Sequence, residues 1–92
     1  MPEKMDELEE LDLSVRAFRN LKRSGIDTID QLIELTGKKN WGQLIPNSGN
    51  AMICEIAQKL EEEELADFSS TVRNSGFNEK TVGVFRDKNY GM

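Results

Sequence analysis

The chain has 92 residues and a net charge of −5, and 32% of its residues are charged. This length suits one domain with a small core. There is no histidine and one cysteine, which argues against Cys/His zinc sites, histidine general bases and disulfides within the chain. The N-terminus is acidic rather than signal-like, and no apolar run is long enough to cross a bilayer. We therefore expect a cytoplasmic, non-catalytic protein without metal or cofactor and without a membrane contact.

Charge is distributed unevenly along the sequence. Residues 1–12 form an acidic lead-in, a short helix or a tail anchored by Leu8 and Leu11. A second acidic block is formed by Glu61, Glu62, Glu63 and Glu64. Between them lies a segment with four basic residues and no acidic neighbour: Arg16, Arg19, Lys22 and Arg23. On a helix Arg16, Arg19 and Arg23 would share one side, so an acidic protein carries a local basic face.

The first clear helix is predicted over residues 15–23. Ser14 is a good N-cap for it, and we expect Val15, Phe18 and Leu21 to form its buried side. A second helix, capped by Asp27 or Thr28, is expected to end near Leu35.

Residues 40–44 have room for a single turn, with Trp41 and Leu44 expected to face the core. Ile45 precedes Pro46 and should be extended. The last clear helix is predicted over residues 50–65, with one apolar stripe formed by Met52, Ile53, Ile56, Ala57 and Leu60. Cys54 fits that stripe as a partly buried small residue.

Residues 67–92 are less clear. They contain scattered apolar residues and a Ser75-Gly76 pair. This C-terminal extension fits a further helical hairpin packed on the domain, a short hairpin of strands, or a tail that orders on a partner. If it packed on residues 15–23, it would cover the basic face.

Two turns precede helices in a similar way, Lys22-Arg23-Ser24-Gly25 and Pro46-Asn47-Ser48-Gly49. We expect each Gly to occupy a left-handed turn between helices. The unpaired amides that open the following helix, together with its dipole, suit a phosphate. A helix-helix connection without a ligand is the simpler alternative. Two such turns in one small domain favour a protein that binds a nucleic-acid backbone.

Two strings carry a family resemblance. The residues from Leu11 to Arg16 and from Asn20 to Thr28, followed by Pro46-Asn47-Ser48-Gly49 and its helix, resemble the C-terminal domain of the bacterial RNA polymerase alpha subunit. The resemblance covers about residues 8–62. It implies a compact all-α domain of four to five helices with helix-hairpin-helix-like turns, here over residues 13–66, which grips the minor groove of A/T-rich DNA and contacts transcription factors.

The resemblance also implies roles for single residues. Arg16 matches the family's principal minor-groove arginine, Gly49 the glycine whose amide meets phosphate, and Glu55 an acidic residue of the same surface. Together with the basic segment, the expected DNA-binding residues are Arg16, Arg19, Asn20, Lys22, Gly49 and Asn50. The sequence departs from the family where basic residues and a serine usually follow the glycine, since Ala51 and Met52 stand there. That change removes a lysine and a hydroxyl from the phosphate side.

Two functions follow from these observations. The first is a transcription-related module that binds DNA through the basic helix and the second turn. The alternative is a protein-binding adaptor or inhibitor, such as one encoded by a mobile element, whose acidic N-terminus and Glu61–Glu64 engage a polymerase, a transcription factor or another nucleic-acid enzyme. Because the sequence begins at Met1 with the domain itself, we expect a free-standing copy or a piece cut from a longer protein.

Overall fold

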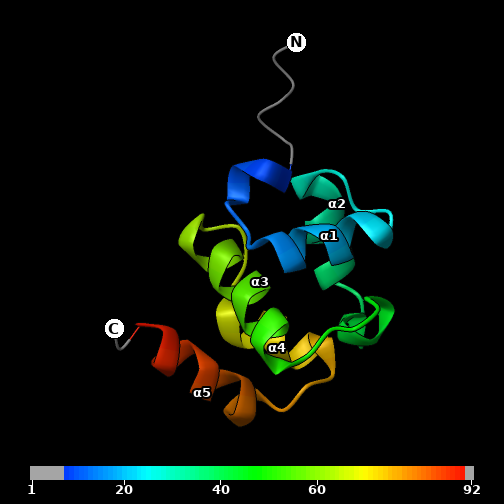
Figure 1. The fold of residues 1–92 in the computed structure, drawn as a ribbon. Helices are drawn as coiled ribbons and strands as arrows, with labels where there is room; N and C mark the ends of the chain where they lie inside the picture. The colour runs from blue at the N-terminus through cyan, green and yellow to red at the C-terminus, as the bar shows by residue number, and fades with distance from the viewer. Residues whose placement is uncertain (1–7, 91–92) are drawn as a thin grey trace.

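One helix, α3 (Asn50–Glu62), occupies the middle of the computed structural model, which describes residues 8–90 and the side chains of residues 8–85. A 3-10 helix, η2 (Leu8–Leu11), and the pair α1 (Val15–Arg23) and α2 (Ile29–Thr36) lie on one side of it (Figure 1).

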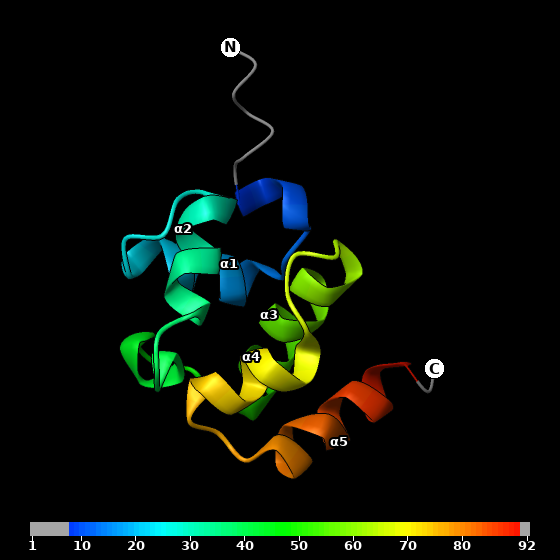
Figure 2. The same ribbon diagram turned by 180° about the vertical axis from the view of Figure 1, so that it is seen from behind.

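A short 3-10 helix, η3 (Trp41–Leu44), connects α2 to α3, and α4 (Phe68–Ser75) and α5 (Glu79–Tyr90) cover the other side of α3 (Figure 2). Within residues 8–90 no strand is formed. The predicted all-α fold of four to five helices is confirmed.

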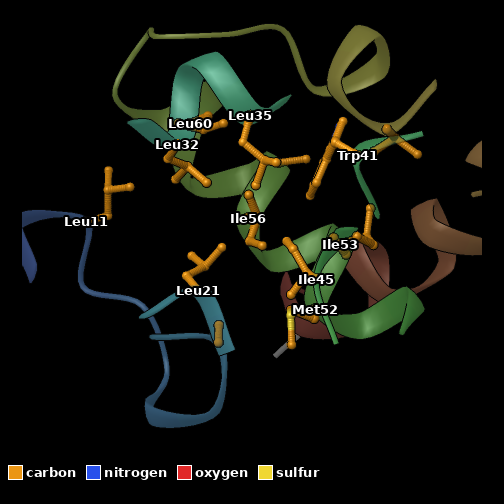
Figure 3. Close-up of a cluster of buried hydrophobic side chains, with 14 of the residues drawn as sticks. Leu11, Leu21, Leu32, Leu35, Trp41, Ile45, Met52, Ile53, Ile56 and Leu60 are labelled. Atoms are coloured by element: carbon orange, nitrogen blue, oxygen red, sulfur yellow. The ribbon is translucent and has the colours of Figure 1, made fainter. Parts of the chain in front are cut away.

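The core is built around α3 because that helix is buried on nearly every side. Its buried residues are Met52, Ile53, Cys54, Ile56, Ala57, Gln58 and Leu60. A helix that is apolar over most of its circumference needs cover from several directions. Leucines of η2, α1 and α2 approach it from one direction and Trp41 from another (Figure 3).

The core includes residues from all three segments expected from the sequence, the acidic lead-in, the central domain and the C-terminal extension. Leu8 and Leu11 of the acidic lead-in are 1% and 3% exposed, and Phe68, Val72 and Val82 of the C-terminal extension join the same cluster. Residues 1–7 of the lead-in and 91–92 of the extension lie outside the described residues. The described parts of segments 1–12, 13–66 and 67–92 therefore share one core.

The C-terminal extension forms a helical hairpin, one of the three structures that the sequence left open. Asp67 caps α4 by accepting a hydrogen bond from the Ser70 amide at 3.0 Å, and Gly76 ends it in a left-handed conformation with φ of 91°. The hairpin is tied to η3 because the Trp41 indole Nε1 donates to the Thr71 carbonyl at 2.9 Å. Phe68, Val72 and Val82 of the hairpin therefore complete the core.

The helix starts predicted from the sequence are confirmed, but several exposures are not. Ser14 and Thr28 cap α1 and α2 as expected, and Ile45 is extended with φ of −105°. Val15 and Leu44, however, are 67% and 53% exposed rather than buried.

The reason is the choice of helix face. The buried side of α1 is Ala17, Asn20 and Leu21, because the small Ala17 lets α1 approach α3 closely while Val15 lies on the opposite side of the first turn. Cys54 is fully rather than partly buried. Helix α3 ends at Glu62 rather than near residue 65.

Gly42 allows the extension to pack on η3. A Cβ at Gly42 would lie 2.7 Å from Phe77 Cε1 and 2.8 Å from the Ser75 carbonyl oxygen, so we expect Gly42→Ala to lower the free energy of unfolding by about 2 kcal/mol. Gly83 in α5 is the matched control, because a Cβ there meets nothing within 4 Å and Gly83→Ala should stabilise by about 0.5–1 kcal/mol. Urea unfolding of both variants measures this, and equal effects would contradict the packing argument.

Candidate functional site

Helix α1 presents the predicted basic face to solvent. Arg16, Arg19 and Arg23 are exposed and line one shallow depression of about 310 Å³ together with Val15 and Asn20. Lys22 lies on a different side of α1, since its Nζ is 3.1 Å from the Asp27 carboxylate and 5.4 Å from the centroid of the Phe18 ring. The structure therefore groups three of the four predicted basic residues and separates Lys22 from them.

Arg16 also lines a larger cleft, of about 510 Å³, between α1 and α3. Ala51 and Met52 of the first turn of α3 form one wall of this cleft, and Gln58 and Lys59 lie further along the same helix. Neither α4 nor α5 contributes a described residue to this cleft or to the depression around Arg19. The described residues of the C-terminal extension thus leave the basic face open.

Glu55 holds the start of α1 in place against α3. Its carboxylate accepts hydrogen bonds from the backbone amide of Ser14 and, at 2.9 Å, from the Ser14 hydroxyl. The same hydroxyl oxygen accepts from the Ala17 amide at 3.3 Å, which makes Ser14 the N-cap of α1. A carboxylate near a helix N-terminus also interacts favourably with the dipole. Glu55 therefore fixes the position of Arg16, two residues after Ser14, relative to α3.

The side chain of Asn20 is largely buried between α1 and α3. It is 6% exposed, and its amide Nδ2 donates to Met52 Sδ at 3.9 Å across the interface between α1 and α3. That Asn20 contacts DNA stays a prediction: its amide has an internal partner in Met52, as a buried amide needs, and the residue also lines the depression around the arginines. Met52 is itself 5% exposed, so it packs in that interface and does not face a phosphate.

The two glycine turns have different backbone hydrogen bonding. At the first turn the amides of Gly25 and Ile26 donate to the carbonyls of Lys22 and Leu21 at 3.0 and 2.9 Å, the pattern of a Schellman cap. The amides of Asp27 and Thr28 donate to the side-chain carbonyl of Gln31. Gly25 has φ of 89°, as expected of a left-handed turn. The amides of this turn are used internally and are not available to a phosphate.

At the second turn Gly49 is the N-cap of α3 and is extended, with φ of −146°. The prediction that Gly49 occupies a left-handed turn is wrong, because the left-handed residue is Asn47, two positions earlier, with φ of 58°. Helix α3 has no side-chain cap hydrogen bond at its start, and Ala51 of its first turn lines the same cleft as Arg16. A Cβ at Gly49 would meet nothing within 4 Å, so internal packing does not require glycine there.

Other predicted features are placed as follows. Glu61–Glu64 lie at and just beyond the C-terminal end of α3, where the Lys59 ammonium is 3.9 Å from the Glu62 carboxylate. Among the described residues no three acidic or cysteine residues gather as a metal site. No helix in that part of the protein is long and apolar enough to span a membrane.

The comparisons with known proteins agree on one family. The family of the C-terminal domain of the bacterial RNA polymerase alpha subunit matches residues 1–62. The protein belongs to this family. Over 58 residues, 63% of its length, it is 48% identical to the DNA-directed RNA polymerase subunit alpha of Ureaplasma parvum. Over 60 residues, 65% of its length, it is 45% identical to that of Oenococcus oeni.

A shorter match of 33 residues, 36% of the sequence, is 58% identical to the alpha subunit of Aster yellows witches'-broom phytoplasma, of which it covers 10%. The matched segments span 17% of the Ureaplasma subunit and 18% of the Oenococcus subunit. No solved structure gives a significant match. The family match ends at residue 62, so α4 and α5 lie beyond it.

Gln58 and Lys59 were missed as parts of the cleft by sequence reasoning. They stand three and four residues after Glu55 and so share its side of α3, a spacing that would have indicated them once Glu55 was placed. Gln58 is 6% exposed, and among the described residues its Nε2 is the buried side-chain nitrogen or oxygen without a hydrogen-bond partner.

The pairing of Ser14 with Glu55 is open to a double-mutant cycle. We expect Ser14→Ala and Glu55→Ala each to destabilise the protein by about 1–2 kcal/mol, because each removes bonds to the open end of α1. Their effects should be non-additive, with a coupling of about 1 kcal/mol. Urea unfolding of both single variants and the double variant gives this value, and strict additivity would show that the two residues act independently.

Proposed function

We propose that this protein binds DNA as a transcription-related module, using the basic face of α1 and the uncapped N-terminus of α3. The observation that carries the proposal is that Arg16 and Ala51, in the uncapped first turn of α3, line the same cleft, in a member of the alpha C-terminal domain family. Helix N-terminal amides bind phosphate, and the dipole favours the negative charge.

The binding mode follows from the two parts of the site. The amides from Asn50 onward hold a backbone phosphate, and Arg16 reaches from the same cleft into the adjacent minor groove. Narrow A/T-rich minor grooves have an enhanced negative potential that favours an inserted guanidinium. Arg19 and Arg23 lie along the same face of α1 and add contacts to neighbouring phosphates. Glu55 positions Arg16 without touching DNA.

The lack of an internal reason for Gly49 supports this role. Neither its φ nor its surroundings require glycine, whereas close approach of a phosphate to the backbone does favour a residue without a side chain. The module acts as a binding protein rather than an enzyme, in the context of RNA polymerase or of a transcription factor, and these partners are part of the proposal.

The first test asks whether DNA affinity depends on where a positive charge is placed on the protein. Arg16→Ala should weaken binding to an A/T-rich duplex at least about tenfold. Ala51→Lys adds a cation beside the open amides and should tighten binding and steepen the slope of log K against log[salt] by about 0.9. Val84→Lys, on exposed α5, changes the net charge equally. Fluorescence anisotropy over a salt series measures all three, and equal effects of Ala51→Lys and Val84→Lys would reject the site.

A second test separates stability from binding. Gly49→Asp supplies the missing N-cap side chain and should raise the free energy of unfolding by about 0.5 kcal/mol. The same carboxylate would occupy the amides and repel phosphate, so DNA affinity should fall at least about tenfold. A variant that is more stable and still binds DNA as well as the parent would show that the start of α3 is not the phosphate site.

A further inference from the structure

The acidic lead-in and the acidic block near residue 63, far apart in the sequence, meet at one groove. We define the acidic groove by its lining residues, Glu10, Leu11, Ile29, Asp30, Ile33, Glu63 and Leu65. Its volume is about 320 Å³, and it lies between η2, α2 and the segment that follows α3. It shares no residue with the two openings that Arg16 lines.

Four residues of the acidic groove's lining are aliphatic, Leu11, Ile29, Ile33 and Leu65. Ile29 and Ile33 pack against the core yet remain partly exposed, and Leu65 is 40% exposed. Glu10, Asp30 and Glu63 are exposed and belong to the same lining, and none of the described lining residues is a lysine or an arginine. Exposed aliphatic surface ringed by one sign of charge attracts a partner of the opposite sign.

Local helix stability does not account for all of this charge. Asp30 lies in the first turn of α2, where the helix dipole favours a carboxylate. Glu63 caps the C-terminal end of α3, where the dipole disfavours one. Glu64 follows in the left-handed region with φ of 59°, a position that suits glycine or asparagine. Of the acidic residues that line the groove, Glu63 therefore stands against local preference, and so does its neighbour Glu64.

We propose that the acidic groove docks a protein segment that presents an aliphatic side chain flanked by lysine or arginine. The aliphatic group packs on Ile29, Ile33 and Leu65, and the flanking cations pair with Glu10, Asp30 and Glu63. The negative rim disfavours nucleic acid as the occupant. This inference does not rest on DNA binding, because the groove and the basic face of α1 are separate surfaces.

The test uses a short helical peptide of alanine, with leucines three and four residues apart flanked by arginines. Added to the full isotope-labelled protein, it should shift the backbone amides around Ile29, Ile33 and Leu65 and approach saturation. A second peptide with serine for each leucine, and a third with glutamate for each arginine, should not. No shift at the groove, or equal shifts with either altered peptide, would overturn the proposal.

Two matched variants locate the site. Glu63→Lys should weaken peptide binding about three- to fivefold, the equivalent of a surface ion pair, and it places a cation at a helix C-terminus where folding favours it. Glu34→Lys makes the same charge change on α2, at an exposed residue that lines a different depression. Equal loss in both variants would show non-specific charge attraction and overturn the groove.

Two further readouts separate the alternatives. Arg16→Ala should leave peptide binding unchanged, so failure of DNA binding and failure of the groove are distinguishable. Sedimentation of the protein at rising concentration tests a second copy as the occupant, since Val15 and the arginines of α1 also combine aliphatic and basic groups. A mass that rises with concentration and returns to the monomer value in Glu63→Lys would assign the groove to self-association and overturn the proposed partner.

Discussion

The burial of α3 on nearly every side is the constraint on which the rest of the structure depends. A small domain has little apolar area with which to offset conformational entropy, and here most of it is gathered around Ile53, Ile56 and Leu60, none of which is measurably exposed. Cover from the α1 and α2 pair leaves one side of such a helix open. Helices α4 and α5, which lie beyond the family match, close that side.

Because α3 is fixed in this way, it also serves as the reference for the candidate site. Ser14 bonds to Glu55, Asn20 bonds to Met52, and both bonds cross from α1 to α3. These contacts set where Arg16 lies relative to the open start of α3. Asn20 and Met52 position the site from a buried interface and Glu55 is half-buried, whereas the arginines that would contact a ligand lie exposed on α1.

Local signals in the sequence predicted the helix starts well, because a cap is decided by a few adjacent residues. Ser14, Thr28 and the Ile45-Pro46 pair needed no tertiary information. The prediction of the buried face of α1 was wrong. Whether Val15 or Ala17 is buried depends on how closely α1 approaches α3, and the local sequence does not contain that distance. For the same reason Asn20 reads as a surface residue until Met52 is placed beside it.

The two glycine turns were predicted to be alike, and the structure shows that their backbone hydrogen bonding differs. Both are short polar segments before an apolar-spaced helix, yet the first uses its amides through Gln31 and a Schellman cap, whereas the second has no capping side chain. Gln31, three residues beyond Thr28, indicates a capping box in the sequence. No glutamate or glutamine stands three residues beyond Gly49, where the residue is Met52. The distinction between a closed and an open helix start was therefore present in the sequence, in the residues that follow each glycine.

The charge pattern has a different logic. A net charge of −5 argues against nucleic-acid binding only if the charges are mixed on one surface, since screening limits the reach of exposed charges to about 8–10 Å. Here Arg16, Arg19 and Arg23 gather on α1, and Glu10, Asp30 and Glu63 gather around the acidic groove. Separation of this kind would let one small domain bind both proposed partners, a polyanion on one surface and a basic protein segment on another, because neither partner would have to displace the other's counter-charge.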